Sequence, residues 1–176
     1  MRRVAIDVDS VLADIIPHIL PILNQKHGTN LQASDIKEWD HPVNGNSIGH
    51  YIRSCLADPA FVLSMPEVPG ARDAMAEIYK KNEIVIATGR PTFCKNNTMK
   101  WLDGRFLYDK IVFSKEKTVE NLQCDVLLDD SPSYLNKFIK SGGKGILFSR
   151  PWNENYVLLG CNCVVDSWPD ALKVIK

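Results

Sequence analysis

Two aspartates separated by one residue, Asp7 and Asp9, follow a short apolar run near the start of the chain. Carboxylates at the end of a buried strand are costly in free energy unless a cation neutralises them. A divalent metal ion together with a phosphate group accounts for such a pair. The alternative is an ordinary turn with two solvated carboxylates, and later segments of the chain decide between these readings.

Three later stretches carry residues that a metal and phosphate site needs. Thr88-Gly89-Arg90 and Asp129-Asp130 each follow an apolar run, and Lys117 lies between them in the sequence. Ligands of an open parallel α/β sheet bind outside the carboxyl ends of its strands, so these stretches meet at one edge if the runs are parallel strands. Lys115 is the rival for the role of Lys117. Asp130 equally fits a charge that interacts with the dipole of the next helix.

These residue types together predict phosphoryl transfer. Mg²⁺ takes hard oxygen ligands and commonly binds one or two carboxylates plus a substrate phosphate, so Asp7 and Asp129 are the expected ligands. Asp7 is also positioned to attack phosphorus and form an aspartyl-phosphate. Lys117, the Thr88 hydroxyl and the Gly89 amide are expected to hold the phosphate oxygens.

The two remaining polar residues have separate expected roles. Asp9 is expected to protonate the leaving oxygen and later to activate water. For Arg90 three interpretations stay open: a contact with the phosphate, a contact with a second anionic group, or an ion pair with a neighbouring carboxylate.

The elements that must position these residues follow from hydrophobic periodicity. Strands alternating with helices predict an α/β fold, with a Rossmann-like parallel sheet of five or six strands covered by helices on both faces. Pro21 is awkward inside the first helix and is expected to kink or break it, and Gly28 is a plausible end. Strands are expected at 4–6, 83–87, 110–113, 125–128, 145–148 and 163–165, and helices at 13–27, 71–81, 92–102, 132–140 and from 167.

Residues 29–66 differ from the rest because they contain turn residues and short helical pieces around 34–38 and 47–56, with no expected sheet strand. We expect residues 15–66 to form a small helical cap inserted after the first strand, and residues 1–14 and 67–176 to form the core. Trp39 in this cap either stacks on a substrate base or belongs to the cap's own core.

Composition limits the classes of partner. The 176 residues include 21 basic and 21 acidic side chains, and this zero net charge argues against a nucleic acid polymer as a partner. No signal peptide is visible and no apolar run approaches the roughly 20 residues of a membrane span, so no membrane partner is expected. A small phosphate monoester is the expected partner, and a homodimer stays open.

The five cysteines are odd in number and scattered, which favours reduced thiols in a cytoplasmic protein over a disulfide framework. Cys161-Asn162-Cys163 is the alternative, as half of a zinc site. No second Cys or His pair with matching spacing completes it.

The motifs, taken together, resemble the haloacid dehalogenase (HAD) superfamily of phosphohydrolases: Asp7-x-Asp9-x-Val11, then Thr88, Lys117 and Asp129-Asp130. The string Asp7-Val8-Asp9-Ser10-Val11-Leu12-Ala13-Asp14 is closer to one branch, the 5'(3')-deoxyribonucleotidases. So are Pro69-Gly70-Ala71, Lys117-Thr118-Val119 and Leu127-Leu128-Asp129-Asp130-Ser131. The resemblance covers about residues 1–150.

This resemblance implies a HAD-like core, a helical cap, Mg²⁺ and hydrolysis of nucleoside monophosphates. It implies that Asp7 is the nucleophile and Asp9 the acid and base, with the Asp9 backbone carbonyl joining Asp7 and Asp129 as a metal ligand. Thr88 and Lys117 match the phosphate binders of the family. Asp130 matches a partner of a metal-bound water.

Three positions depart from the pattern of the resembled family. Ser10 replaces a glycine, Ile15 stands where an aromatic residue packs on the base, and Gly89-Arg90 replaces a Ser-Pro continuation. The last two favour the alternative of a HAD phosphatase that acts on another small phosphorylated metabolite. A catalytically silent phosphate-binding module is the remaining alternative, although such a module needs no general acid beside a nucleophile.

Overall fold

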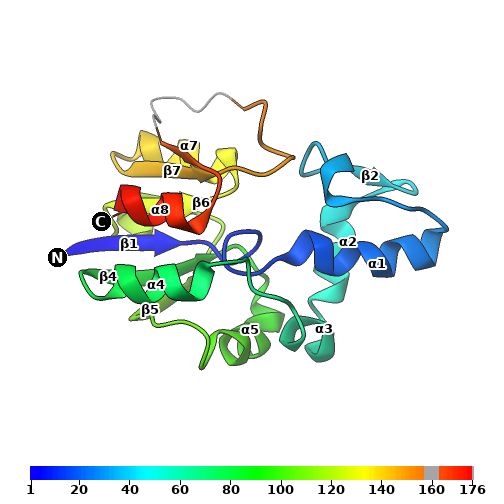
Figure 1. The fold of residues 1–176 in the computed structure, drawn as a ribbon, viewed down its shortest axis with the longest axis horizontal. Helices are drawn as coiled ribbons and strands as arrows, with labels where there is room; N and C mark the ends of the chain where they lie inside the picture. The colour runs from blue at the N-terminus through cyan, green and yellow to red at the C-terminus, as the bar shows by residue number, and fades with distance from the viewer. Residues whose placement is uncertain (157–162, 176) are drawn as a thin grey trace.

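A six-stranded parallel sheet forms the centre of the computed structural model, which describes residues 1–156 and 163–175 (Figure 1). Its strands are β1 (Arg2–Ile6), β4 (Asn82–Thr88), β5 (Lys110–Phe113), β6 (Val126–Asp129), β7 (Lys144–Phe148) and β8 (Val164–Val165). They lie in the order β5-β4-β1-β6-β7-β8, and every neighbouring pair is parallel. The predicted α/β fold is therefore confirmed.

Helices cover both faces of this sheet. They are α4 (Ala71–Tyr79), α5 (Lys95–Leu102), α6 (Val119–Leu122), α7 (Pro132–Lys140) and α8 (Trp168–Ile175). Val4 and Ile6 of β1 point into an apolar cluster that includes side chains of α4 and α8, whereas Ala5 points into a second cluster with α6 and α7. This alternation follows from the two-residue period of a strand.

Helix α7 begins where the sequence predicts. Ser131 is the N-cap and Pro132 occupies the first turn, where the missing N–H of proline leaves no intrahelical bond unmade. Leu135 and Phe138 are buried against the sheet, and the chain turns at Gly142, whose φ is 96°. The opposite side of α7 faces away from the sheet.

A separate lobe is inserted between β1 and α4, and it projects from the carboxyl edge of the sheet (Figure 1). Its elements are α1 (Ile15–His27), the 3₁₀ turn η1 (Ala33–Asp35), β2 (Pro42–Val43), β3 (Asn46–Ser47), α2 (Ile48–Cys55) and α3 (Pro59–Leu63). The chain enters and leaves this lobe at adjacent points, because Ala13 pairs with Glu67 and the Val68 N–H donates to the Leu12 carbonyl at 2.7 Å. The division into a core and a cap stays a prediction.

Helix α1 continues through Pro21 without a break. Pro21 is exposed, whereas Ile16, Leu20 and Leu23 are buried, so packing of the apolar side holds the helix together. The helix ends at Gly28 as predicted, with a left-handed φ of 65°.

The expectation that residues 29–66 contain no sheet strand is wrong. β2 and β3 form a short antiparallel hairpin, in which Val43 pairs with Asn46. Asn44 and Gly45 connect the strands with φ values of 46° and 83°, and a two-residue turn with two positive φ values is the connection that suits a hairpin. The Asn-Gly pair was the signal for it. The piece expected as a helix at 34–38 is only the short turn η1.

Ser10 occupies a backbone conformation that favours glycine. Its φ is 64°, and its buried hydroxyl has no hydrogen-bond partner among the described residues. Its N–H donates to the Ala13 carbonyl at 2.7 Å, and its carbonyl accepts from Arg150 Nε at 2.8 Å and Nη2 at 2.6 Å. These bonds fix the turn, so the serine retains a strain of about 1–2 kcal/mol.

We predict that Ser10→Gly raises the free energy of unfolding by about 1 kcal/mol, because relief of this strain exceeds the added chain entropy of glycine. Urea denaturation of the parent and the variant measures the difference. Ser10→Ala, which removes the hydroxyl and keeps the Cβ, serves as the control and is expected to gain less. A Ser10→Gly protein less stable than the parent would show that the turn is not strained.

Candidate active site

Three adjacent strands bring the predicted residues to one edge of the sheet. Asp7 directly follows β1, Thr88 is the last residue of β4 and Asp129 is the last residue of β6, and β1 lies between β4 and β6. The Asp7 N–H donates to the Leu128 carbonyl at 3.0 Å, which continues the pairing of β1 with β6 to the position of the carboxylate. The carboxyl ends of parallel strands thus bring together side chains that are far apart in the sequence.

Lys117 connects two of these carboxylates. Its ammonium lies 2.7 Å from Asp7 Oδ1 and 2.6 Å from Asp129 Oδ2, and its side chain is fully buried. Lys115, the rival position, is exposed. The Tyr134 ring lies against Lys117 at 4.6 Å from its ammonium and covers the remaining side of the buried cation.

The site carries more negative charge than this lysine neutralises. Oxygen atoms of Asp7, Asp129 and Asp130 lie within 4.8 Å of one another, and all three residues are buried. Three carboxylates against one ammonium leave an excess of negative charge in a poorly solvated place. The donor set is all oxygen, so it fits a hard divalent cation such as Mg²⁺.

Burial is the main cause that raises the pKa of Asp7 to about 7; Lys117 opposes this shift, whereas Asp129 and Asp9 add to it. Burial also raises the pKa of Asp129 and that of Asp130. When no metal ion is bound, Asp7 is therefore only partly ionised at neutral pH.

We predict that Mg²⁺ binding weakens as the pH falls below about 7, because a proton on Asp7, whose pKa is raised to about 7, competes with the metal. The loss is up to about 10-fold per pH unit for one displaced proton. Calorimetric titration with Mg²⁺ at pH 6 and 8, in two buffers of different ionisation enthalpy, measures the affinity and the proton release. Equal affinity at both pH values, with no protons released, would contradict the prediction.

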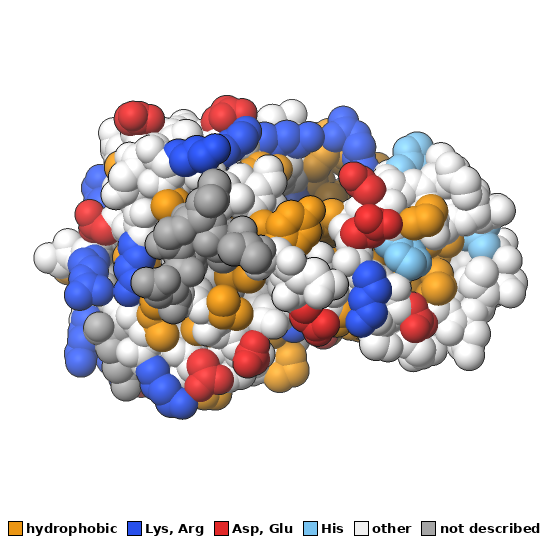
Figure 2. All heavy atoms as spheres, turned by 90° about the horizontal axis from the view of Figure 1, so that it is seen from above, with side chains coloured by type: hydrophobic (Ala, Val, Ile, Leu, Met, Phe, Trp, Pro, Cys, Tyr) orange, Lys and Arg blue, Asp and Glu red, His pale blue; other side chains and the backbone are white. Residues whose placement is uncertain are grey.

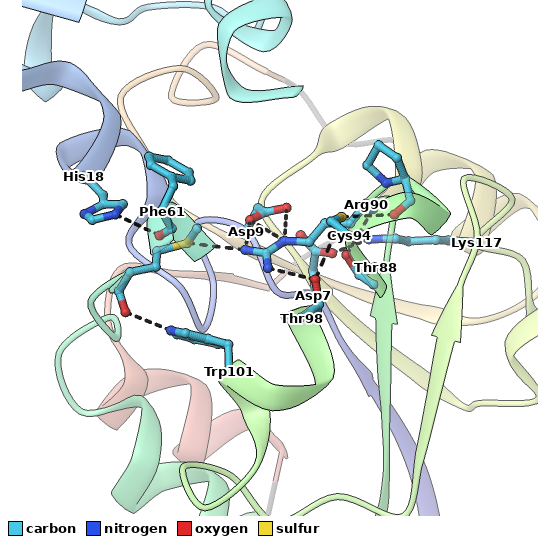
Figure 3. A network of polar contacts seen from close by, with 12 residues as sticks. Asp7, Asp9, His18, Phe61, Thr88, Arg90, Cys94, Thr98, Trp101 and Lys117 are labelled. Carbon is cyan, nitrogen blue, oxygen red and sulfur yellow. Dashed lines mark hydrogen bonds and ion pairs between the residues drawn. The ribbon is translucent and has the colours of Figure 1, made fainter. Parts of the chain in front are cut away.

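Arg90 forms an ion pair with Asp9, which is one of its three interpretations, and it also lines the cavity (Figure 3). Arg90 Nε donates to both Asp9 oxygens at 3.1 Å, and Nη2 donates to Oδ1 at 2.6 Å. Thr98 Oγ1 accepts from Nη1 at 3.1 Å, and Met65 Sδ lies 3.3 Å from Nη2. The guanidinium is fully buried, and groups of the same protein accept its hydrogen bonds without a substrate.

Thr88 and Gly89 form the turn that carries Arg90. The Thr88 hydroxyl accepts from the Arg90 N–H at 3.1 Å, and the side chain is fully buried. A Cβ added to Gly89 would lie 3.0 Å from the Tyr134 hydroxyl, so this position has little room for a side chain. Gly89 lines the cavity above Asp7.

A loop that follows β7 and that was not among the expected site residues also reaches the site. Arg150 donates twice to the Ser10 carbonyl, and Asn153 Nδ2 donates to the Asp130 carbonyl at 2.8 Å. Trp152 donates from Nε1 to Asp130 Oδ2 at 2.8 Å. The available signal was position, because Arg150-Pro151-Trp152-Asn153 directly follows a strand at the same sheet edge.

We predict that Trp152→Phe lowers the affinity for Mg²⁺ by about 10-fold, since the partners of ligand groups orient them and tune their affinity. The change removes the N–H that holds one Asp130 oxygen and keeps an aromatic ring. Trp101→Phe is the matched control, because Trp101 is equally buried but donates to the Met65 carbonyl. Calorimetry gives the affinity and thermal unfolding gives the stability. An equal loss of affinity in both variants would assign the effect to packing.

A cavity of about 970 Å³ opens above the carboxylates, between the core and the inserted lobe. Figure 2 shows the corresponding hollow, with basic side chains along one rim. Trp39, Ile52 and Leu56 of the lobe line this cavity. The Trp39 ring lies 5.7 Å from that of Trp152, centre to centre, and partly packs on the core. Trp39 thus packs on the core as well as lining the cavity, and its stacking on a base stays a prediction.

The other expected features are quickly placed. Cys161 and Asn162 lie outside the described residues, so the proposed half of a zinc site is not tested. Cys55, Cys94 and Cys124 are free thiols. Among the described residues, no helix has the length and apolar character needed to cross a membrane.

The fold and the clustered Asp, Thr and Lys residues define a phosphohydrolase of the haloacid dehalogenase type. Residues 2–176 match the family described as "5' nucleotidase, deoxy (Pyrimidine), cytosolic type C protein". The chain belongs to this family and is, with it, a phosphoric monoester hydrolase.

Known relatives agree with this assignment. A 5'(3')-deoxyribonucleotidase of Bacillus subtilis is 27% identical over 160 residues, which cover 88% of each chain. A haloacid dehalogenase-like hydrolase of Streptococcus pneumoniae has a similar structure, with a TM-score of 0.68 at 14% identity over 100% of this chain and 99% of the other. A magnesium-bound HAD hydrolase of Bacillus subtilis gives 0.63 at 11% identity, over 99% and 98%. At these identities, the two structures support the fold alone.

Proposed function

We propose that this protein is a Mg²⁺-dependent phosphatase of nucleoside or deoxynucleoside monophosphates that works through an aspartyl-phosphate on Asp7. The observation that carries the proposal is the buried Lys117 ammonium between Asp7 and Asp129. A cation in that place orients the nucleophile and supplies positive charge where the phosphate develops negative charge. The name of the Bacillus subtilis relative supports the substrate class.

Each residue of the site has a separate proposed role. Lys117 holds Asp7 Oδ1, so Oδ2 is the oxygen that attacks phosphorus as the ester P–O bond breaks. The Gly89 amide and the Thr88 hydroxyl hold phosphate oxygens. Asp7, Asp129 and the Asp9 carbonyl would hold Mg²⁺, with Asp130 binding a coordinated water. The metal supplies charge neutralisation when bound.

Asp9 serves the two proton transfers. It gives a proton to the departing ester oxygen, and it later takes one from the water that attacks the aspartyl-phosphate. Both Asp9 oxygens accept from Arg90 in the structure. For either proton transfer, one of these oxygens must leave the guanidinium and turn towards the substrate.

A second candidate is a phosphatase of another small phosphorylated metabolite. The observation that favours it concerns Ile15, which stands where the resembled nucleotidases carry an aromatic that packs on the base. Ile15 is fully buried in the main apolar cluster and does not line the cavity.

We predict that Asp7→Asn abolishes phosphate release, because the amide is no nucleophile, and that Asp9→Asn binds Mg²⁺ but loses turnover by about 10²–10⁴-fold. The assay measures phosphate release with Mg²⁺ from 5'- and 3'-nucleotides, sugar phosphates and an aryl phosphate. Asp73→Asn, which removes an exposed charge on α4, is the control.

The panel also separates the candidates. Release only from compounds that are not nucleotides supports the second one. Full activity of Asp7→Asn would overturn the mechanism, and full activity of Asp9→Asn would overturn the acid and base role. Binding of phosphate without any release would indicate the catalytically silent module.

A further inference from the structure

One wall of the cavity is the outer side of α7. Ser133, Asn136, Lys137 and Lys140 all line the cavity, and their spacing of three and four residues places them on one helix face. The opposite face is anchored to the sheet by buried side chains, so this wall is a fixed part of the core.

This wall is basic. Lys115, from the loop after β5, lines the cavity beside Lys137 and Lys140. Glu116 pairs with Lys137 at 3.1 Å, and both side chains are exposed, at 67% and 44%. Lys115 and Lys140 take part in none of the ion pairs formed by the described residues. Three ammonium groups therefore meet one carboxylate on this wall.

The wall extends away from the reacting centre along the axis of α7. α7 begins directly after its N-cap Ser131, whose N–H donates to Asp129 Oδ1 at 2.8 Å. At the helical rise, the backbone of Lys137 lies about 9 Å and that of Lys140 about 14 Å from Ser131 along the axis. An anion held by these side chains is thus bound apart from the phosphate at Asp7, in the same cavity.

We propose that the Lys115, Lys137 and Lys140 wall binds a second phosphate of the substrate, so that the preferred substrate class is a phosphomonoester that carries another phosphate on the same small molecule. The inference rests on the proposed function and specifies its substrate. Nucleoside 3',5'-bisphosphates and pentose bisphosphates share this chemistry. The scissile phosphate lies at Asp7, and the second one stays intact on the wall.

A general attraction of anions is the competing explanation, because a basic rim raises the encounter rate with any dianion. The two explanations differ in selectivity. Attraction at a distance favours both mono- and bisphosphates, whereas a subsite contributes only when the second phosphate is present.

The experiment compares two substrate pairs: a nucleoside 5'-monophosphate with its 3',5'-bisphosphate, and a pentose 5-phosphate with the 1,5-bisphosphate. We expect KM to be about 10-fold lower for the bisphosphate of at least one pair, which also identifies the source of the second phosphate. In the double variant Lys137→Gln/Lys140→Gln this KM rises about 10-fold, while that of the monophosphate changes less than about twofold.

Lys110→Gln/Lys144→Gln is the matched control. It removes the same charge from exposed positions at the starts of β5 and β7, on the opposite edge of the sheet. We expect it to leave every KM unchanged.

Several outcomes would overturn the subsite. One is equal KM values of the parent for mono- and bisphosphates. Another is an equal rise of both KM values in the wall variant, which indicates attraction only. If the parent hydrolyses no phosphate ester, the proposed function fails. Calorimetry with the 3',5'-bisphosphate then tests the wall alone: a loss of affinity confined to the wall variant supports the subsite, and equal affinities overturn it.

Discussion

The structure depends on one buried ammonium, that of Lys117, held between Asp7 and Asp129. A buried charge is tolerated only when it is paired and hydrogen-bonded, and removal of one partner of a buried pair typically costs about 3–5 kcal/mol. The two carboxylates lie at the ends of β1 and β6, which are neighbours in the sheet, so this strand pairing is a condition for the arrangement. The same three side chains therefore serve both the site and the fold. A sheet with its strands in another order would leave this lysine and these two aspartates without their partners.

A second buried cation gives Asp9 a different environment from that of Asp7. Arg90 donates to both Asp9 oxygens, and it also contacts Met65, where the chain returns from the inserted lobe. Two carboxylates only two residues apart therefore face different cations, an ammonium and a guanidinium. This difference provides a physical basis for two separate roles, because Arg90 is planar and bidentate whereas Lys117 acts as a compact charge.

Much of the core and of the site's composition follows from local patterns. Apolar runs that end in Asp7, Thr88 and Asp129 predict parallel strands, and parallel strands share one carboxyl edge. What the sequence does not reveal is side-chain pairing over long separations. Arg150 meets the Ser10 carbonyl across 140 positions, and Trp152 meets Asp130 only because the β7 loop folds back over β6. The hairpin at Asn44-Gly45 is a different case, since its signal was local and was interpreted only as a turn.

Substrate choice is a separate physical problem from the chemistry. The floor of the cavity is occupied by groups that pair with one another, namely Asp7, Asp129 and Lys117. Discrimination between substrates has to come from the other surfaces of the cavity. These are the apolar surface of the inserted lobe around Trp39 and Ile52, and the basic face of α7. An apolar surface favours a flat base but discriminates weakly between ligands, because burial of apolar area is non-directional. Charged groups fixed on a rigid helix distinguish ligands by the position of their charges, so the proposed subsite on α7 would discriminate between phosphate esters more sharply than an apolar surface.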